Sequence, residues 1–467
     1  MRTGKMPLPH RRPPVPAELG PQQAFALALS LHRAGGLDDA EKLYQRILEV
    51  TPAHADALHF KGVLAHQRGR SEQALELIQR SIALNGTVPD WYNNLGNVLL
   101  EMGRVDAAAQ AYEQAARLGP ERADIHNNLG VLRREQRRSE ESEAAYRRAI
   151  QLEPKYADAH TNLGSLLSGL GRSEEALACY CEALLLKPRH VLARQLLGMA
   201  YYTLGRIDDA VQVYRDWLKD DPASPEARHH LAACSGDAVP ERAADAYVEK
   251  VFDGFADSFD AKLAHLHYRA PELIGQTVAT LFGEPRRALA VLDAGCGTGL
   301  CGPLLAPYAR HLQGVDLSER MLTRARPRQV YDALTKAELT AFIEAAAAAS
   351  YDLIVSADTL CYFGDLQAVA RAAAKALRPG GWLVFTVEAL ADAGEAGFHL
   401  NPHGRYSHRE SYLREVLASA GLVVGELQRA HLRLEGGKPV EGWVVASRNH
   451  ADADADAAAS SSSRTSA

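Results

Sequence analysis

Hydrophobic and polar positions in the first half of the chain repeat every 34 residues without an insertion. A small residue recurs at this spacing, and a tyrosine or isoleucine follows it four positions later. The small residues are Ala40, Ala74, Ala108, Ser142, Ala176 and Ala210, and the larger ones are Tyr44, Ile78, Tyr112, Tyr146, Tyr180 and Tyr214. Because side chains four positions apart share one face of a helix, each unit is predicted to contain a helix with a buried face.

Glycines and prolines mark the ends of these predicted helices. A proline or glycine follows each small residue after twelve positions, as at Pro120 and Pro154. In the later units a preceding helix carries a Leu-Gly pair, as at Leu163-Gly164, and a turn glycine such as Gly171 separates the two helices. The glycine of each pair is expected to let neighbouring helices approach closely.

Residues 21–222 therefore resemble the tetratricopeptide-repeat family, whose unit of about 34 residues is a helix–turn–helix. The resemblance implies an α solenoid, the TPR superhelix, with six repeats. Residues 225–234 are expected to form a capping helix, so that this domain covers 21–234. A solenoid of this kind presents a concave binding surface.

Asparagines form a second series with the same period. Asn94, Asn128 and Asn162 each lie two positions before a Leu-Gly glycine. On the inner helices, their amides could donate to and accept from an extended backbone, which predicts a groove that binds a protein or peptide partner. The alternative is that these amides bond the adjacent repeat or water.

The second half of the chain has a different pattern. A buried run from Ala288 reads as a parallel strand that leads into Asp293-x-Gly295-x-Gly297-x-Gly299. Glycines let the backbone approach a ligand closely, and a following helix N-terminus offers free N–H groups. A dinucleotide-binding loop would instead read G-x-G-x-x-G.

Further strands follow in order. A strand over 311–315 ends in Asp316, where a carboxylate can accept from both hydroxyls of a ribose. A third, poorly marked strand is expected at 329–334, a fourth at 351–358 and a fifth after 377–381. A strand near 422–434, a Gly436-Gly437 turn and a strand near 441–446 predict a terminal antiparallel hairpin. The alanine run 345–349 is expected to be helical.

Residues 288–447 resemble the class I S-adenosylmethionine-dependent methyltransferases. The resemblance implies an α/β, doubly wound, mainly parallel seven-stranded sheet over 286–448, and S-adenosyl-L-methionine as cofactor; a Rossmann dehydrogenase is the alternative. Glu338 is the expected adenine contact, with Asp332 as the second choice. The full cofactor-binding set is Asp293, Gly295, Cys296, Gly297, Gly299, Asp316, Leu317, Glu338 and Asp358.

The segment 235–285 is expected to be a linker followed by N-terminal lid helices. Its aromatics Phe252, Phe255 and Phe259 would cover the cofactor, or else pack against the core. Methyl transfer needs a base only if the acceptor is a hydroxyl or ammonium. His408, Tyr362 and Asp358 are the candidate catalytic residues, and Arg405 with Tyr406 would suit an anionic acceptor.

Composition narrows the partners and the location. A net charge of −6 and a pI near 6.3 argue against nucleic acid or an anionic membrane as a partner. The six cysteines lack metal-ligand spacing, so we expect no metal site and reduced thiols in the cytoplasm. Residues 1–20 read as a disordered leader and 449–467 as a disordered tail. No run is long and apolar enough to span a membrane.

The sequence thus predicts an enzyme that transfers a methyl group to an unidentified small-molecule or protein acceptor, with a solenoid that binds a protein. The alternative is a catalytically silent scaffold with a vestigial methyltransferase fold. The intact Asp293, glycines and Asp316 favour the enzyme. A third reading is that the solenoid mediates self-association.

Overall fold

The computed structural model describes residues 20–256, 259–391, 396–435 and 438–450. Most of the expected leader and tail, Asp257, Ser258 and the Gly436-Gly437 turn lie outside the described residues. The chain forms two compact units, which divide between Leu132 and Arg133. Within the described ranges, no helix is long and apolar enough to cross a membrane.

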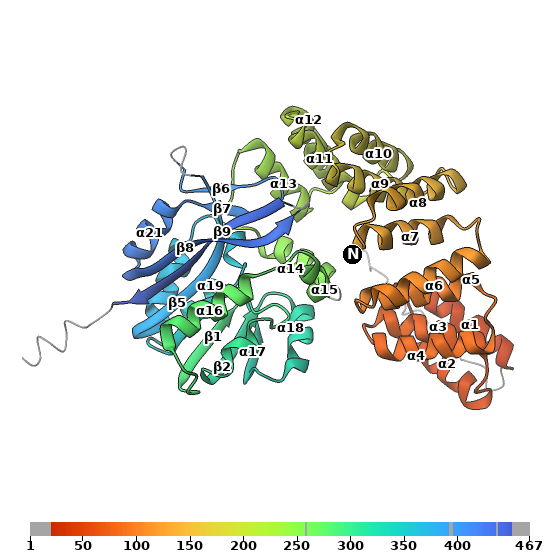
Figure 1. Cartoon of the computed structure of the whole chain (residues 1–467), viewed down its shortest axis with the longest axis horizontal. Helices are drawn as coiled ribbons and strands as arrows, with labels where there is room; N and C mark the ends of the chain where they lie inside the picture. Colours follow the sequence, from red (N-terminus) through yellow and green to blue (C-terminus); the bar gives the residue numbers. More distant parts are fainter. Residues whose placement is uncertain (1–19, 257–258, 392–395, 436–437, 451–467) are drawn as a thin grey trace, which may run out of the picture. The chain divides into compact units, whose positions relative to one another are not determined.

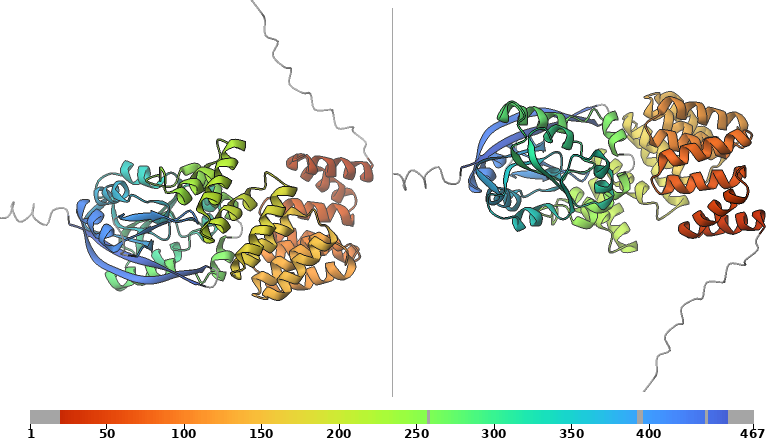
Figure 2. Two further views of the ribbon diagram at one scale, coloured as in Figure 1. Left: turned by 90° about the horizontal axis from the view of Figure 1, so that it is seen from above. Right: turned by 90° about the horizontal axis from the view of Figure 1, so that it is seen from below.

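Residues 21–235 form consecutive helices that pair as the 34-residue period predicts (Figures 1 and 2). In the first unit these are α1 (Pro21–Arg33), α2 (Leu37–Val50), α3 (Ala55–Gln67), α4 (Ser71–Leu84), α5 (Pro89–Glu101) and α6 (Val105–Leu118). Helix α7 (Ala123–Glu135) crosses the division. The second unit contains α8 (Ser139–Leu152), α9 (Ala157–Gly169), α10 (Ser173–Leu186), α11 (Val191–Thr203), α12 (Ile207–Asp220) and the capping helix α13 (Pro225–Ser235). The predicted tetratricopeptide repeats are confirmed.

In later repeats the recurring tyrosine packs against the Leu-Gly glycine. The Tyr180 ring is 1% exposed and lies over Gly164, where an added Cβ would be 2.6 Å from a ring carbon. Gly198 stands in the same relation to Tyr214, at 2.3 Å. The glycine therefore makes room for the ring, which explains why both residues recur at the same period.

The second unit also contains a twisted sheet. Its strands are β1 (Leu289–Ala294), β2 (Ala309–Asp316), β3 (Ala333–Lys336), β4 (Tyr351–Ser356), β5 (Leu377–Ala389), β8 (Leu422–Glu435) and β9 (Lys438–Asn449). They lie in the order β3-β2-β1-β4-β5-β9-β8, with β9 antiparallel to β5 and β8 antiparallel to β9. The expected fold is confirmed, including the terminal hairpin. A short hairpin, β6 (Phe398–Leu400) and β7 (Tyr406–His408), joins β5 in addition.

Helices cover both faces of this sheet. On one face, Val291 and Leu353 pack against Ile274 of α16 (Ala270–Phe282). On the other, Leu292 and Ile354 pack with α19 (Leu339–Ala345), α20 (Gln367–Ala376) and α21 (Glu410–Ser419). Consecutive strand residues therefore point into two separate cores, as a doubly wound sheet requires. The remaining helices are α14 (Asp245–Phe255), α15 (Phe259–His265), α17 (Gly302–Leu305) and α18 (Glu319–Ala325).

Two local predictions were wrong. The third strand is Ala333–Lys336, later than expected, because a 3₁₀ turn at Arg326–Arg328 precedes it and Ala333 pairs with Gln313 of β2. The alanine run is not helical beyond Ala345. Ala349 has a φ of 56° and its N–H donates to the Lys375 carbonyl, so the backbone turns there to enter β4.

Candidate functional site

A cavity of about 180 Å³ lies where the carboxyl ends of β1, β2 and β4 meet the helices α14 and α15. In an open α/β sheet, ligands bind in the crevice outside the carboxyl ends of the strands, where the strand order reverses. The order changes direction here between β1 and β4. Every residue of the predicted cofactor-binding set lines this cavity except Gly299, where an added Cβ would lie 2.9 Å from a Tyr331 ring carbon. Binding of a cofactor by these residues stays a prediction.

The glycine loop forms one wall of the cavity, and its glycines serve different purposes. An added Cβ at Gly295 would be 2.2 Å from the Thr359 hydroxyl, so this glycine is required by packing. At Gly297, whose φ is 55°, the nearest heavy atom to an added Cβ is a Phe259 ring carbon at 4.0 Å. Gly297 thus leaves open the space into which a ligand can approach the backbone.

Asp316 is the last residue of β2 and faces the same loop. One carboxylate oxygen accepts from the Gly297 N–H at 2.9 Å and the other from the Ser318 N–H at 2.8 Å. Burial raises the pKa of this carboxyl. A carboxylate has about four acceptor positions, so Asp316 retains capacity for ligand hydroxyls. The neighbouring Leu317 also lines the cavity.

Asp293 lies beneath the loop and is 1% exposed. Its carboxylate accepts from the Tyr331 hydroxyl at 2.6 Å, and burial raises its pKa to about 7 despite that bond. Cys296 also lines the cavity, where burial raises the pKa of its thiol. Asp293 and Cys296 are therefore buried side chains that line the cavity.

Of the two acids proposed for adenine, only Glu338 lies in the cavity. Its carboxylate caps α19 by accepting from the Thr340 and Ala341 N–H groups at 3.0 and 2.8 Å. Asp332 instead accepts from the Leu312 N–H at 2.7 Å outside the cavity lining. The position of Glu338 suits a ligand amino group; that role stays a prediction.

The expected lid helices do border the cavity. Phe252 and Phe259 line it with their ring centroids 6.1 Å apart, whereas Phe255 is 43% exposed. Asp253 of α14 accepts from the Ser318 hydroxyl at 2.5 Å. The two helices are thus attached to the residues that follow β2 and the glycine loop.

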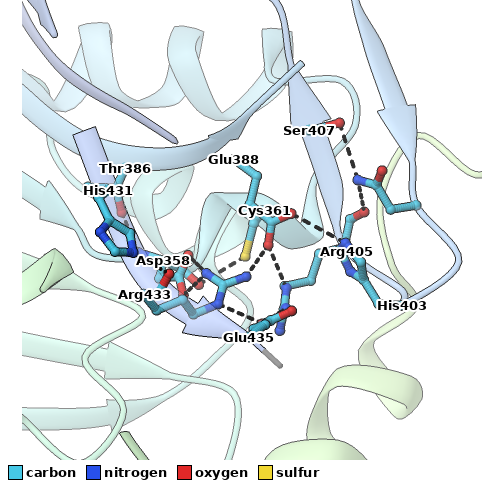
Figure 3. A network of polar contacts seen from close by, with 11 residues as sticks. Asp358, Cys361, Thr386, Glu388, His403, Arg405, Ser407, His431, Arg433 and Glu435 are labelled. Atoms are coloured by element: carbon cyan, nitrogen blue, oxygen red, sulfur yellow. Dashed lines mark hydrogen bonds and ion pairs between the residues drawn. The ribbon is translucent and has the colours of Figure 1, made fainter. Parts of the chain in front are cut away.

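A network of buried charges forms the opposite wall (Figure 3). Arg433, 2% exposed, donates to both carboxylate oxygens of Asp358 at 2.9 and 3.1 Å, to Glu435 at 2.8 Å and to Glu388. Arg405 donates to Glu388 at 2.7 Å and to Glu435. Although burial opposes it, the two guanidinium groups hold the pKa of Glu435 at about 2. Asp358, Arg405, Arg433 and Glu435 all line the cavity.

The three predicted catalytic residues have different positions. Asp358 and Tyr362 line the cavity, but the Asp358 carboxylate is occupied by Arg433, and burial raises the pKa of the Tyr362 hydroxyl. His408 does not line the cavity: it is completely buried, its Nε2–H donates to the Gly364 carbonyl at 3.0 Å, and burial lowers its pKa to about 4. The prediction of His408 as a base is wrong on this geometry, because its ring is held inside the fold.

Arg433 and Glu435 are not among the site residues that the sequence predicts. Both lie on β8, and their partners are Asp358, which follows β4, and Glu388 of β5. The signal in the sequence that could have indicated them is that Arg433 and Glu435 alternate with leucines at the end of β8. The network becomes visible only when the terminal hairpin is placed beside β5.

The asparagine series contacts the preceding repeat. Asn94 lies 3.1 Å from His59 Nε2, and the Asn128 amide donates to Asn93 at 3.0 Å and to Asn97 at 3.3 Å. Asn94, Asn128 and Asn162 are each half-buried. These contacts match the alternative reading, in which the amides join neighbouring repeats; binding of a peptide by them stays a prediction.

Comparison with known families agrees with both halves of the structure. A model described as a tetratricopeptide repeat matches residues 25–89, 93–159 and 161–225, and one described as a methyltransferase domain matches residues 265–427. The chain carries tetratricopeptide repeats and a methyltransferase domain.

The methyltransferase domain is similar to several curated proteins. It is 32% identical over 152 residues to a ubiquinone biosynthesis O-methyltransferase of Hydrogenovibrio crunogenus, covering 29% of this chain and 63% of that protein. It is 34% identical over 112 residues to methyltransferase-like protein 27 of Homo sapiens, covering 24% and 44%. It is 33% identical over 136 residues to a malonyl-[acyl-carrier protein] O-methyltransferase of Enterobacter lignolyticus, covering 29% of this chain and 53% of that protein. In each case the matched region spans less than two thirds of the relative.

Solved structures similar to this chain include tetratricopeptide-repeat proteins. PilF of Pseudomonas aeruginosa is 20% identical with a TM-score of 0.40, covering 45% of this chain and 96% of that one. TTC0263, a TPR protein of Thermus thermophilus, is 24% identical with a TM-score of 0.36, covering 39% and 100%.

Arg433→Met tests the charge network of the methyltransferase domain. The variant leaves Asp358 without its guanidinium partner, so we expect the free energy of unfolding to fall by about 3–5 kcal/mol at pH 7.5. Arg433 lowers the pKa values of Glu388 and Glu435, so in its absence these two carboxyl groups take up protons more readily in the folded variant as the pH falls. The deficit relative to the unchanged chain should therefore shrink at pH 5.5, as measured by urea unfolding.

Arg429→Met is the matched control, because Arg429 lies on the same strand, is 61% exposed and pairs with Glu441 at 3.6 Å. We expect that change to alter stability by less than about 1 kcal/mol. An equal deficit for Arg433→Met at both pH values would contradict the network.

Proposed function

We propose that the chain is an S-adenosyl-L-methionine-dependent methyltransferase whose repeats bind a protein partner or substrate. The observation that supports this most is the open space over Gly297 beside the Asp316 carboxylate, within the cavity of a methyltransferase domain. The resemblance to O-methyltransferases supports an oxygen as the acceptor atom.

The residues of the cavity fit this cofactor. Asp316 would accept from the ribose hydroxyls, Glu338 from the adenine amino group, and Gly297 would let the backbone approach the ligand. When bound, the cofactor supplies a methyl group on a sulfonium, which is a good leaving group. The cavity carries more acidic than basic side chains, and this excess suits a ligand with a positive sulfur.

The protein's own part in the reaction is to orient the acceptor and to exclude water. Phe252 and Phe259 cover the cavity, and apolar Leu263, Leu266 and Pro271 also line it. An acceptor with an apolar body would be enclosed by these residues. Its reactive oxygen would then point along the line of displacement.

The charge network favours an acceptor that needs no base. Among the described cavity-lining residues there is no histidine or lysine, and the Asp358 and Glu435 carboxylates are paired with arginine. Arg405 uses Nε and Nη2 on Glu388 and Glu435, which leaves Nη1 as a donor toward an anionic acceptor. We therefore favour a carboxylate oxygen as the acceptor.

The role of the repeats and the location are further parts of this proposal. A partner held along the inner helices would bring a substrate, or its carrier, to the chain. Location in the cytoplasm stays a prediction.

A pull-down tests whether the asparagine amides hold this partner. It compares the unchanged chain with a variant in which Asn94, Asn128 and Asn162 are all alanine, which should capture less of the partner. Equal capture would reject that role.

Cofactor binding is tested by titration calorimetry of the full chain with S-adenosylmethionine. Asp316→Asn removes one charge-assisted acceptor and should weaken binding by about 10–100-fold. Asp332→Asn, which alters a carboxylate outside the cavity lining, is the control and should bind as the unchanged chain does. A folded chain that binds no cofactor would favour the scaffold reading instead.

The acceptor class is tested with cofactor that carries a tritiated methyl group. Incubation of the full chain with small-molecule and protein fractions of a lysate should label a product that the Asp316→Asn variant labels far more weakly. Because methyl esters are cleaved by mild base, the label should then be released as methanol. A label that is stable to base would contradict the carboxylate acceptor and leave an ether or amine.

A further inference from the structure

The loop over 401–405, between β6 and β7, carries Arg405 into the cavity wall. Asn401 closes the loop, because its N–H and side-chain amide both donate to the Arg405 carbonyl, at 2.9 and 3.0 Å. Arg405 itself lines the cavity, is 21% exposed and pairs with Glu388 and Glu435. The position of this guanidinium therefore depends on how the loop is held.

The loop is held from the far side by the capping helix α13. The His229 Nε2–H donates to the Gly404 carbonyl at 2.8 Å, and the His230 Nδ1–H donates to the Pro402 carbonyl at 3.0 Å. His229 is 5% exposed and His230 is completely buried. Both bonds span more than 170 positions in the sequence, so they join the end of the repeats to the end of the methyltransferase domain.

Each histidine is itself fixed in place. His230 Nε2 accepts from the Gln195 amide of α11 at 3.0 Å, which sets its tautomer and ties it to the last repeat. The His229 ring stacks on Tyr247 of α14 with centroids 4.1 Å apart. A Cβ added to Gly404 would lie 2.4 Å from the Tyr247 hydroxyl, so the loop is packed closely against these rings.

Apolar contacts reinforce the same arrangement. Ala232 and Ala233 of α13 share a core cluster with Leu400 and Tyr406, which flank the loop. The opposite face of α13 packs against α12 through Ala227 and Cys234. The helix therefore belongs to both the repeat array and the methyltransferase domain.

We propose that α13 is a positioning element of the methyl-transfer site: His229 and His230 hold the 401–405 loop so that Arg405 faces the acceptor side of the cavity. This rests on the proposed function, since it assumes that the cavity binds the cofactor. His229 and His230 are positioning residues, which act through Arg405. Gln195 extends the connection into the repeats, where a bound partner would contact the same inner helices.

The proposal can be tested without knowing the acceptor. S-adenosylhomocysteine has no transferable methyl, whereas sinefungin carries a protonated amine in place of the transferable methyl, on the carbon that replaces the sulfur. The ratio of their affinities therefore reports on charge at the acceptor side. Removing one cation in Arg405→Ala should favour sinefungin by about five-fold relative to S-adenosylhomocysteine, as measured by calorimetry on the full chain.

The variant His229→Phe/His230→Phe keeps two aromatic rings but removes both donors to the loop. We expect the ratio to move in the same direction, by about three-fold or more, with the S-adenosylhomocysteine affinity unchanged within about two-fold. Adding Arg405→Ala to this variant should produce little further change, because both act through the same guanidinium. His160→Phe removes a similar bond, to the Pro154 carbonyl at 3.1 Å, and should leave the ratio unchanged.

A ratio that shifts in Arg405→Ala but not in the double histidine variant would overturn the positioning role. If the ratio shifts in neither variant, Arg405 does not face the acceptor side, and the positioning role is overturned as well. If the double variant fails to fold, His229→Phe is compared with His229→Gln, whose amide can still donate to Gly404; only the former should shift the ratio, and equal shifts would overturn the proposal. An unchanged chain that binds neither ligand would instead reject the proposed function itself.

Discussion

The bond from the Gly297 N–H to the Asp316 carboxylate joins the loop after β1 to the end of β2. The rest of the site depends on this contact, because it fixes a carboxylate beside the one glycine of the loop whose missing side chain leaves open space. Gly295 and Thr359 hold the loop from below, and Phe259 covers it from above. A ligand with a ribose and a positive sulfur would find acceptors, room and an apolar cover in one place.

The opposite wall follows a different physical principle. Arg433 and Glu388 are buried, and Asp358, Arg405 and Glu435 are partly buried beside them. Such groups are costly to remove from water unless each is paired. The network uses residues from the segment after β4, from β5, from β8 and from the 401–405 loop, so it forms only when all four are in place. It therefore links the shape of the acceptor side to the integrity of the terminal hairpin and, through the loop, to α13.

Much of this could be predicted from the sequence, because the information is local. The repeats follow from a fixed period, and Asp293, the glycines and Asp316 lie within one strand–loop–helix–strand segment. The remainder depends on pairs that are distant in the chain: Arg433 meets Asp358 across 75 positions and Glu388 across 45. His408 was assigned as a base because free histidine titrates near neutrality, a property that burial removes here. The hairpin β6–β7 was missed because three-residue strands carry too little pattern.

The most direct test of the central claim is a crystal structure of the full chain grown with S-adenosylhomocysteine. The account predicts that the ribose hydroxyls lie within hydrogen-bonding distance of Asp316 and that the ligand lies against the Gly297 backbone. It also predicts that the sulfur is directed toward the wall that holds Arg405 and Arg433. A ligand bound elsewhere, or a ribose that does not contact Asp316, would contradict it.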